Sequence, residues 1–322
     1  MIEVLKIEDL KIYYQTLKGE VKAVDGISFE LKKGEILGIA GESGCGKSTF
    51  GNSLVLLKPP MKYVGGKVKL ENEEVPIWDF EKMKEYRYKK ISIIPQYAMD
   101  AMNPIKKIGK MIKDIMEDRN IEYEKIENRL KERLHLVNLP LNVLNMYPIE
   151  LSGGMKQRVV MVIATLLNPS VLIADEITSA LDVSTQKAVA KMLVKFKDEG
   201  YVKSVIFITH DVSILYQIAD SMVIMYAGKI VERGKTEEII NNPIHPYTKL
   251  LISSLPEVGV KHSEKPLEGI PGQPPALLDP PKGCRFKDRC PVSMKICEEE
   301  PPYIQIKENR WVACWREVKE HA

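Results

Sequence analysis

The stretch that decides the fold is "GEILGIAGESGCGKSTF", residues 34–50. Its first part, "EILGIA", is a short apolar run that is typical of a buried strand. The next part, "GESGCGKS" from Gly41 to Ser48, fits the pattern G-x-x-x-x-G-K-[ST] in full, and the helical pattern "TFGNSLVLL" follows it. This order of strand, loop and helix is the context in which the pattern forms a phosphate-binding loop. The alternative is a Gly-rich turn that matches by chance.

The residue types of this loop suit the binding of a nucleoside triphosphate with Mg²⁺. Glycines let the backbone wrap closely around phosphates, so that its amides point at the oxygens. The side chain of Lys47 can reach the β and γ phosphates, and the hydroxyl of Ser48 can ligate Mg²⁺. Cys45 is a small residue whose backbone matters more here than its thiol. The nucleotide contacts predicted in this loop are Gly41, Ser43, Gly44, Cys45, Gly46, Lys47, Ser48 and Thr49.

A second stretch, "PSVLIADEITSALD" from Pro169 to Asp182, supplies acidic residues for the same site. "VLIAD" has the pattern of another buried strand, and it ends at Asp175. A carboxylate there can hold Mg²⁺ together with Ser48, and the next residue, Glu176, is placed to polarise an attacking water. An acidic pair after a strand is a weak signal alone. Together with a complete phosphate loop it predicts an ATPase.

The bulk properties fit a globular protein of the cytosol. The 322 residues contain 47 basic and 44 acidic side chains, and this balance gives no indication of nucleic acid binding. The N-terminal "MIEVLKIEDL" is charged from its third residue, unlike a signal peptide. The longest apolar runs, such as "VVMVIATLL", are about half the ~18 residues that a membrane helix needs.

The stretch "LSGGMKQR", Leu151 to Arg158, is a motif that points to one particular family of ATPases. With it, the sequence resembles the ATPase subunit of an ABC transporter. The resemblance implies that Ser152, Gly153 and Gly154 begin a helix that clamps the γ-phosphate of ATP held by the opposite subunit. A hydroxyl, free amides and a positive helix end suit that role. The alternative is an ordinary helix cap followed by a tight turn.

The same resemblance assigns roles to four further residues, which occur in the order of the family. Tyr14 matches the aromatic residue that stacks on adenine, with its neighbour Tyr13 as the competing candidate. Gln96 matches the glutamine that contacts Mg²⁺ and senses the membrane partner, and His210 matches the histidine that reaches the γ-phosphate. Asp182 matches the loop that crosses between the two subunits. The predicted catalytic residues are Glu176, His210 and Gln96, and the predicted Mg²⁺ ligands are Ser48, Gln96 and Asp175.

The expected fold is an α/β P-loop ATPase core with two additions. Residues 1–255 form the ATPase domain, whose strand-like start suggests an antiparallel β portion. A helical subdomain spans about 99–150, where apolar residues recur at helical spacing. After Ser170, strand and helix patterns alternate, as expected for a parallel sheet. Residues 256–322 form a small Cys-rich extension.

Two C-terminal stretches narrow the resemblance to the dipeptide/oligopeptide branch of ABC importers. They are "NNPIHPYTKLLISSLP" (Asn241–Pro256) and "GIPGQPPALLDPPKGCRFKDRCPVSMKIC" (residues 269–297). "SGGMKQR" resembles the D-type ATPase of this branch, whereas Tyr97 departs from the acidic residue often found after the glutamine. The resemblance implies an F-type partner in an ATPase heterodimer, two membrane permeases, an extracytoplasmic solute-binding protein, and a place on the cytoplasmic side of the membrane.

Other functions remain open at this point. Relatives of the same branch move oligosaccharides or nickel, and nothing in this chain contacts the solute. A protein of another class, a soluble ABC ATPase acting on DNA or ribosomes, typically shows long coiled coils or tandem ATPase halves. This sequence has neither.

Four of the five cysteines lie near the C-terminus, at Cys284, Cys290, Cys297 and Cys314. Four thiolates can hold a [4Fe–4S] cluster or a structural Zn²⁺. The spacing lacks the close C-x₂-C pairs of most zinc sites, and reducing conditions in the cytosol disfavour disulfides. The resemblance favours [4Fe–4S], with Zn²⁺ as the alternative. In either case the metal would staple a Pro-rich segment that has too little apolar sequence for a core of its own.

Overall fold

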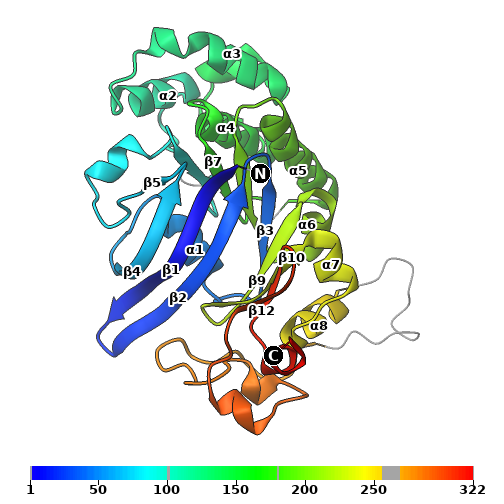
Figure 1. Ribbon diagram of the computed structural model, residues 1–322. Helices are drawn as coiled ribbons and strands as arrows, with labels where there is room; N and C mark the ends of the chain where they lie inside the picture. Colours follow the sequence, from blue (N-terminus) through cyan, green and yellow to red (C-terminus); the bar gives the residue numbers. More distant parts are fainter. Residues whose placement is uncertain (1, 100–101, 180, 256–268, 322) are drawn as a thin grey trace.

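The computed structural model describes residues 2–99, 102–179, 181–255 and 269–321, and their strands form two sheets (Figure 1). One is a four-stranded antiparallel sheet in the order β2-β1-β4-β5, and the other is an eight-stranded sheet in the order β11-β12-β10-β9-β3-β8-β7-β6. The strands are β1 (Glu3–Thr16), β2 (Gly19–Lys32), β3 (Ile36–Ala40), β4 (Met61–Leu70), β5 (Glu73–Glu74), β6 (Ile91–Ile94), β7 (Val171–Asp175), β8 (Ser204–Ile208), β9 (Ser221–Tyr226), β10 (Lys229–Lys235), β11 (Ile304–Lys307) and β12 (Arg310–Val312).

Helices connect and cover these strands. The α-helices are α1 (Lys47–Ser53), α2 (Ile108–Glu117), α3 (Glu127–Leu136), α4 (Gly153–Thr165), α5 (Val183–Asp198), α6 (Val212–Ile218), α7 (Thr236–Asn241), α8 (Pro246–Ser253) and α9 (Trp315–His321). Short 3₁₀ helices are η1 (Lys82–Glu85), η2 (Tyr123–Lys125), η3 (Leu141–Asn145), η4 (Pro148–Glu150), η5 (Lys287–Arg289) and η6 (Lys295–Glu298).

The centre of the large sheet is parallel and buried on both faces. β3 pairs in parallel with β8 and β9, and β7 pairs in parallel with β6 and β8. Every residue of β3, β7 and β8 is buried, because layers cover both faces of this part of the sheet. Only part of the expected parallel sheet is present, since β10 runs antiparallel to β9.

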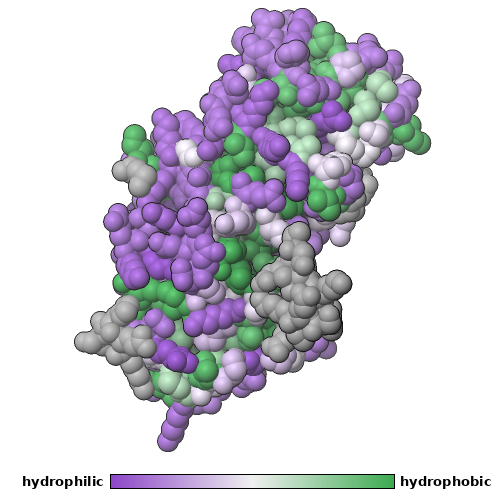
Figure 2. All heavy atoms as spheres, turned by 90° about the vertical axis from the view of Figure 1, so that its right-hand side faces the viewer, coloured by the Kyte–Doolittle hydropathy of each residue, from purple (hydrophilic) through white to green (hydrophobic). Residues whose placement is uncertain are grey.

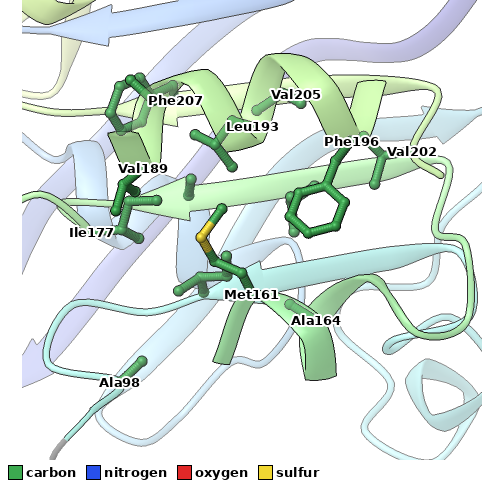
Figure 3. Close-up of a cluster of buried hydrophobic side chains, with 14 of the residues drawn as sticks. Ala98, Met161, Ala164, Ile177, Val189, Leu193, Phe196, Val202, Val205 and Phe207 are labelled. Atoms are coloured by element: carbon green, nitrogen blue, oxygen red, sulfur yellow. The ribbon is translucent and has the colours of Figure 1, made fainter. Parts of the chain in front are cut away.

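Alternate residues of the parallel strands enter two different hydrophobic clusters. On one face α4 and α5 pack on the sheet, and Figure 3 shows Met161, Leu193 and Phe196 among the side chains that meet there. On the other face α1 and the antiparallel sheet supply apolar residues such as Phe29 and Phe50. The carboxyl ends of β3, β7 and β8 lie at one edge of the sheet, so the residues that follow these strands are brought together.

The α2–α3 region lies at the top of Figure 1, within the range where the sequence predicts helices. Residues 100–101 of that range lie outside the described residues. In α2, Ile108, Met111, Ile112 and Met116 are buried, and this spacing puts them on one helix face. Figure 2 shows that the surface at this end of the molecule is mostly hydrophilic.

The residues after 268 are joined to the ATPase body. β12 pairs with β10, and β11 pairs with β12, so both strands extend the large sheet. Phe286 is buried and packs against Tyr226 and Tyr247, with ring centroids 5.2 and 5.4 Å apart. The segment does not pack as a free appendix, because Phe286 enters the hydrophobic core of the ATPase and Ile270 and Leu277 pack against that core. The predicted boundary at 255 adjoins residues 256–268, which lie outside the described residues.

Candidate functional site

The phosphate-binding loop follows β3, and close backbone contacts fix its shape. A Cβ atom at Gly46 would lie 2.0 Å from the carbonyl oxygen of Ala23, and one at Gly41 would lie 2.1 Å from that of Met225. Gly46 also has φ 105°, which favours glycine. The side chain of Lys47 is buried, and its Nζ donates to the carbonyl oxygens of Gly41 (2.8 Å) and Glu42 (2.9 Å). The lysine therefore lies across the hollow of the loop.

Ser48 and Asp175 form the part of the site that suits Mg²⁺. The hydroxyl of Ser48 donates to Oδ1 of Asp175 at 2.9 Å. Oδ2 of Asp175 is buried and has no hydrogen-bond partner among the described residues, and burial raises the pKa of this carboxyl to about 6, against the effect of the Ser48 hydrogen bond. A buried carboxylate oxygen needs a partner. An oxygen-binding cation beside the Ser48 hydroxyl meets that need, so these residues fit Mg²⁺.

The three predicted catalytic residues meet at the carboxyl ends of three neighbouring strands. Oε2 of Glu176 accepts hydrogen bonds from Nε2 of Gln96 at 2.9 Å and from Oγ of Ser179 at 3.3 Å. Oε1 of Glu176 lies 3.6 Å from Nδ1 of His210. Gln96 follows β6, Glu176 follows β7 and His210 follows β8. Gln96 thus contacts the predicted base itself, whereas its contact with Mg²⁺ stays a prediction.

The two candidate adenine-stacking tyrosines have different surroundings. Tyr13 is buried, and its hydroxyl donates to Asp25 at 2.5 Å. Tyr14 is half-buried, and its hydroxyl lies 3.0 Å from Oγ1 of Thr49 in α1. Tyr14 therefore contacts the helix that follows the phosphate loop through its hydroxyl, and its stacking on adenine stays a prediction.

Ser152 and Asp182 both cap helices. Oγ of Ser152 accepts from the backbone amide of Met155 at 3.3 Å at the start of α4, and a Cβ atom at Gly153 would meet nothing within 4 Å. Asp182 caps α5, and hydrogen bonds from the hydroxyls and amides of Ser184 and Thr185 hold the pKa of its carboxyl well below the usual range. Both caps are exposed, so they are available to a second subunit.

The four C-terminal cysteines line one cavity. Cys284, Cys290, Cys297 and Cys314 border it together with His245, and burial raises the pKa of the Cys284 thiol to about 11. The fifth cysteine, Cys45, is buried in the phosphate loop and does not line this cavity. Within the described residues, no group of three or more His, Cys, Asp or Glu side chains is placed to hold a metal ion.

The sequence did not indicate two residues that contact the phosphate-binding loop. Arg289 binds the carboxylate of Glu42 in the phosphate loop, and the hydroxyl of Tyr247 accepts from the amide of Glu42. These partners lie more than 200 residues apart in the chain. The one available signal was the acidic residue inside a loop that binds phosphates, because its charge requires a partner.

The fold and this site define a P-loop ATPase, and comparisons with known proteins specify its family. The ABC transporter family matches residues 24–179, and the C-terminal region of oligopeptide/dipeptide transporters matches residues 231–297. The chain is 39% identical to a dipeptide transport ATP-binding protein of Caldanaerobacter subterraneus, over 97% of this chain and 96% of that one. It is 40% identical to an oligopeptide transport ATP-binding protein of Bacillus subtilis, over 97% of this chain and 88% of that one.

Solved structures agree with this family. A dimeric bacterial ABC transporter cassette superposes with a TM-score of 0.62 at 25% identity, over 72% of this chain and 98% of that one. A post-hydrolysis state of an ATP-binding cassette, bound to ADP and phosphate, gives the same TM-score at 26% identity. The chain therefore belongs to the ABC transporter ATPases, in the branch of the dipeptide and oligopeptide transport ATP-binding proteins, and it is an ATPase.

Among the described residues, no helix has both the length and the apolar character needed to cross a membrane.

Proposed function

We propose that this chain hydrolyses ATP to power an importer of dipeptides or oligopeptides. The observation that carries the proposal is a complete ATPase site on a chain that also has the C-terminal region of oligopeptide/dipeptide transporters. Relatives that match nearly its whole length are named for dipeptide or oligopeptide transport. The second candidates, oligosaccharide and nickel uptake or a role outside transport, are not favoured by any residue of the site.

The residues of the site have the following roles in the proposed reaction. Lys47 and the loop amides bind the phosphates, and Tyr14 stacks on the adenine. Ser48 and Asp175 hold Mg²⁺, which neutralises charge on the phosphates when it is bound. Glu176 accepts the proton of the attacking water.

Gln96 and His210 complete the site around Glu176. Both contact its carboxylate, and this geometry lets them orient the base and respond to the γ-phosphate. Because Gln96 contacts the base and precedes the helical region in the chain, it can also transmit the state of a membrane partner. The contacts of Gln96 and His210 with Mg²⁺ and the γ-phosphate are part of this proposal.

The signature Ser152–Gly154 and Asp182 act across a dimer of two ATPases. Both are exposed helix starts, where a hydroxyl or free amides can receive an anion from outside the chain. The proposed partner is an F-type ATPase, which gives a heterodimer. This dimer closes when each phosphate loop holds ATP and opens after hydrolysis.

Docking on two membrane permeases is supported by a groove between the large sheet and the α2 region. It has a volume of about 340 Å³, and its lining includes Ile93, Pro95, Met111 and Ile163. Pro95 is the neighbour of Gln96, so an element seated in the groove would reach the catalytic site. A permease docked here, fed by an extracytoplasmic solute-binding protein, places this chain on the cytoplasmic side of the membrane.

Transport can be tested in vesicles that contain this chain with a second ATPase, two membrane permeases and a solute-binding protein of the same transporter. A dipeptide-loaded binding protein should stimulate ATP hydrolysis several-fold, and labelled dipeptide should accumulate only with ATP. Stimulation by nickel or an oligosaccharide, with none by peptides, would reassign the solute. Full hydrolysis without any membrane partner or stimulation would favour a role outside transport.

We propose further that the four C-terminal cysteines hold a [4Fe–4S] cluster. The support is that all four thiols border one cavity. Zn²⁺ at about 2.3 Å from each of four thiolates requires sulfur atoms about 3.8 Å apart, and the cysteine spacing lacks the close C-x₂-C pairs of most zinc sites. A cluster binds each thiolate through a different iron, so its ligands stand further apart around a shared space.

Metal analysis tests the cluster directly. Anaerobically purified protein should contain about four iron atoms per chain, as the cluster type requires, and be brown. Cys290→Ser should remove the colour, whereas Cys45→Ser should keep it, because Cys45 lies in the phosphate loop. One zinc and no iron per chain would replace the cluster with a zinc site.

A further inference from the structure

The five residues between Cys284 and Cys290, "RFKDR", connect the cysteine cavity to the phosphate loop. Nη1 of Arg289 lies 2.7 Å from Oε2 of Glu42, and Nη2 of Arg289 lies 2.9 Å from Oε1 of the same carboxylate. This is a two-pronged ion pair in which the side chain of Arg289 is only 6% exposed and that of Glu42 is 24% exposed. Such pairs fix orientation as well as charge.

Glu42 sets the shape of the loop through its backbone as well. Its amide donates to the hydroxyl of Tyr247 at 2.8 Å, and its carbonyl oxygen accepts from Nζ of Lys47 at 2.9 Å and from the amide of Cys45 at 3.3 Å. A rotation of Glu42 would therefore move an acceptor of the lysine that binds phosphates.

Arg289 is held by several groups besides Glu42. Its Nε donates to the carbonyl oxygen of Pro271 at 2.6 Å, and its Nη1 donates to the hydroxyl of Tyr226 at 3.1 Å. Phe286, three residues earlier, packs against the ring of Tyr226. The guanidinium is therefore fixed before any nucleotide arrives.

Arg285, at the other end of the segment, supports the second wall of the site. It donates to the carboxylate of Asp25, which also receives the hydroxyl of Tyr13, and to the carbonyl oxygen of Ala227. Tyr13 precedes Tyr14 in β1, and Asp25 lies two residues after Ala23, whose carbonyl closely approaches Gly46. Arg289 thus contacts the phosphate-binding loop directly, whereas Arg285 contacts residues near it.

The charge of Glu42 explains why its position matters. A carboxylate in a loop that receives three phosphates repels them unless it is neutralised or turned away. We propose that Arg289 is a positioning residue for ATP, which turns the Glu42 carboxylate away from the phosphates and cancels its charge. The proposal rests on ATP binding and not on what the cysteines hold. The ion pair also couples the phosphate-binding loop to residues 284–290. A change in order around Cys290 alters the contact of Arg289 with Glu42, and ATP must reciprocally stabilise residues 284–290.

Variants that remove the charge of Arg289, of Glu42 or of both test the proposal. The measured quantities are the affinity for a fluorescent ATP analogue with Mg²⁺ and the steady-state constants. Arg289→Gln should weaken analogue binding about tenfold, within the range of couplings between neighbouring groups, and raise KM while kcat changes little. Glu42→Gln should bind the analogue as well as the unaltered protein or better. The double variant should regain most of the loss, because it restores the local charge balance.

Two controls separate positioning from folding. Lys287→Gln changes a residue of the same segment that pairs with Glu298 and should leave analogue affinity unchanged. Hydrogen exchange at residues 284–290 should slow when the ATP analogue saturates the unaltered protein, and this effect should be lost in Arg289→Gln. If the double variant binds as weakly as Arg289→Gln, or if the analogue leaves exchange at 284–290 unchanged, the proposal is wrong. If Arg289→Gln does not fold, Glu42→Gln alone provides the test. Binding of the ATP analogue weakened tenfold in Glu42→Gln would overturn the proposal.

Discussion

The backbone of Glu176 has a conformation that costs energy. Its φ is 47°, which is uncommon for a residue with a side chain and typical of functional sites. In return, the carboxylate meets Gln96, Ser179 and His210 at once. The surrounding structure therefore stabilises an arrangement that the local sequence would not adopt alone.

Replacement of Glu176 by glutamine keeps the shape and removes the proton acceptor. We expect Glu176→Gln to bind ATP normally and to lower ATP turnover by about 10²-fold or more, because general bases contribute on this order. The measurement is phosphate release by the assembled transporter, with nucleotide affinity as the control. Turnover close to that of the unaltered protein would exclude Glu176 as the base.

Gly46 and Gly44 provide a matched test of the phosphate loop. Both have positive φ, but a Cβ atom at Gly46 would meet the oxygen of Ala23 at 2.0 Å, whereas one at Gly44 would meet nothing within 4 Å. Gly46→Ala should therefore abolish nucleotide binding. Gly44→Ala should only lower the free energy of unfolding, by about 1 kcal/mol. Equal effects of the two substitutions on nucleotide affinity would contradict the close contact with Ala23.

At the residue scale the sequence indicated candidate nucleotide-site residues because their motifs are short, local patterns; the roles of these residues stay predictions. Gly41–Ser48 follows a buried strand, Asp175 is the last residue of another, and Glu176 comes directly after it; parallel strands bring such positions together. The pair Glu42 and Arg289 could not be predicted, because nothing local in either stretch specifies a partner 247 residues away.

The start of α4 shows how one element can have two roles. Ser152 caps the helix through the amide of Met155, and the same hydroxyl is the proposed contact with the partner's ATP. Aspartate is as good a helix cap as serine but carries a negative charge. Ser152→Asp therefore separates the two roles.

We expect Ser152→Asp to leave the folded stability within about 0.5 kcal/mol, since the cap is retained. ATP should still bind to this chain's own loop, but the dimer should no longer close on ATP, because the added charge faces the γ-phosphate. Crosslinking or light scattering with ATP measures closure, and Ser152→Thr, a neutral cap with a hydroxyl, is the control. Closure at the normal ATP concentration would contradict a role across the dimer.

At the element scale the sequence predicted helices in the 99–150 range and buried strands before the proposed catalytic residues, because both have clear hydrophobic patterns. It did not predict β11 and β12. The stretch "IQIKENRWV" alternates apolar and polar residues around a turn at Asn309, which has φ 57°, so the signal was present. The cysteines and prolines nearby favoured an irregular metal-bound segment instead.

For the whole molecule, one link between the C-terminal strands and the ATPase body is a buried ion pair. Arg310 of β12 donates to Glu232 of β10, and both side chains are at most 2% exposed. Glu232 also accepts from the backbone amides of Ile244 and His245, at 2.8 and 3.0 Å. Burial raises the pKa of Glu232, and the charge of Arg310 opposes that rise. The carboxylate thus depends on a partner from a strand 78 residues later.

Arg310→Met should therefore destabilise the whole chain, because it leaves a buried carboxylate without its cation. Loss of one partner of such a pair costs about 3–5 kcal/mol, whereas loss of both charges costs much less. We expect Glu232→Gln combined with Arg310→Met to recover more than half of the lost free energy of unfolding, measured in urea. Since β12 pairs with β10 within the large sheet, unfolding should remain one transition when followed both at Trp311 in β12 and through nucleotide release. A separate, earlier transition of the C-terminal strands, or a cost below about 1 kcal/mol, would show that they fold independently of the ATPase body.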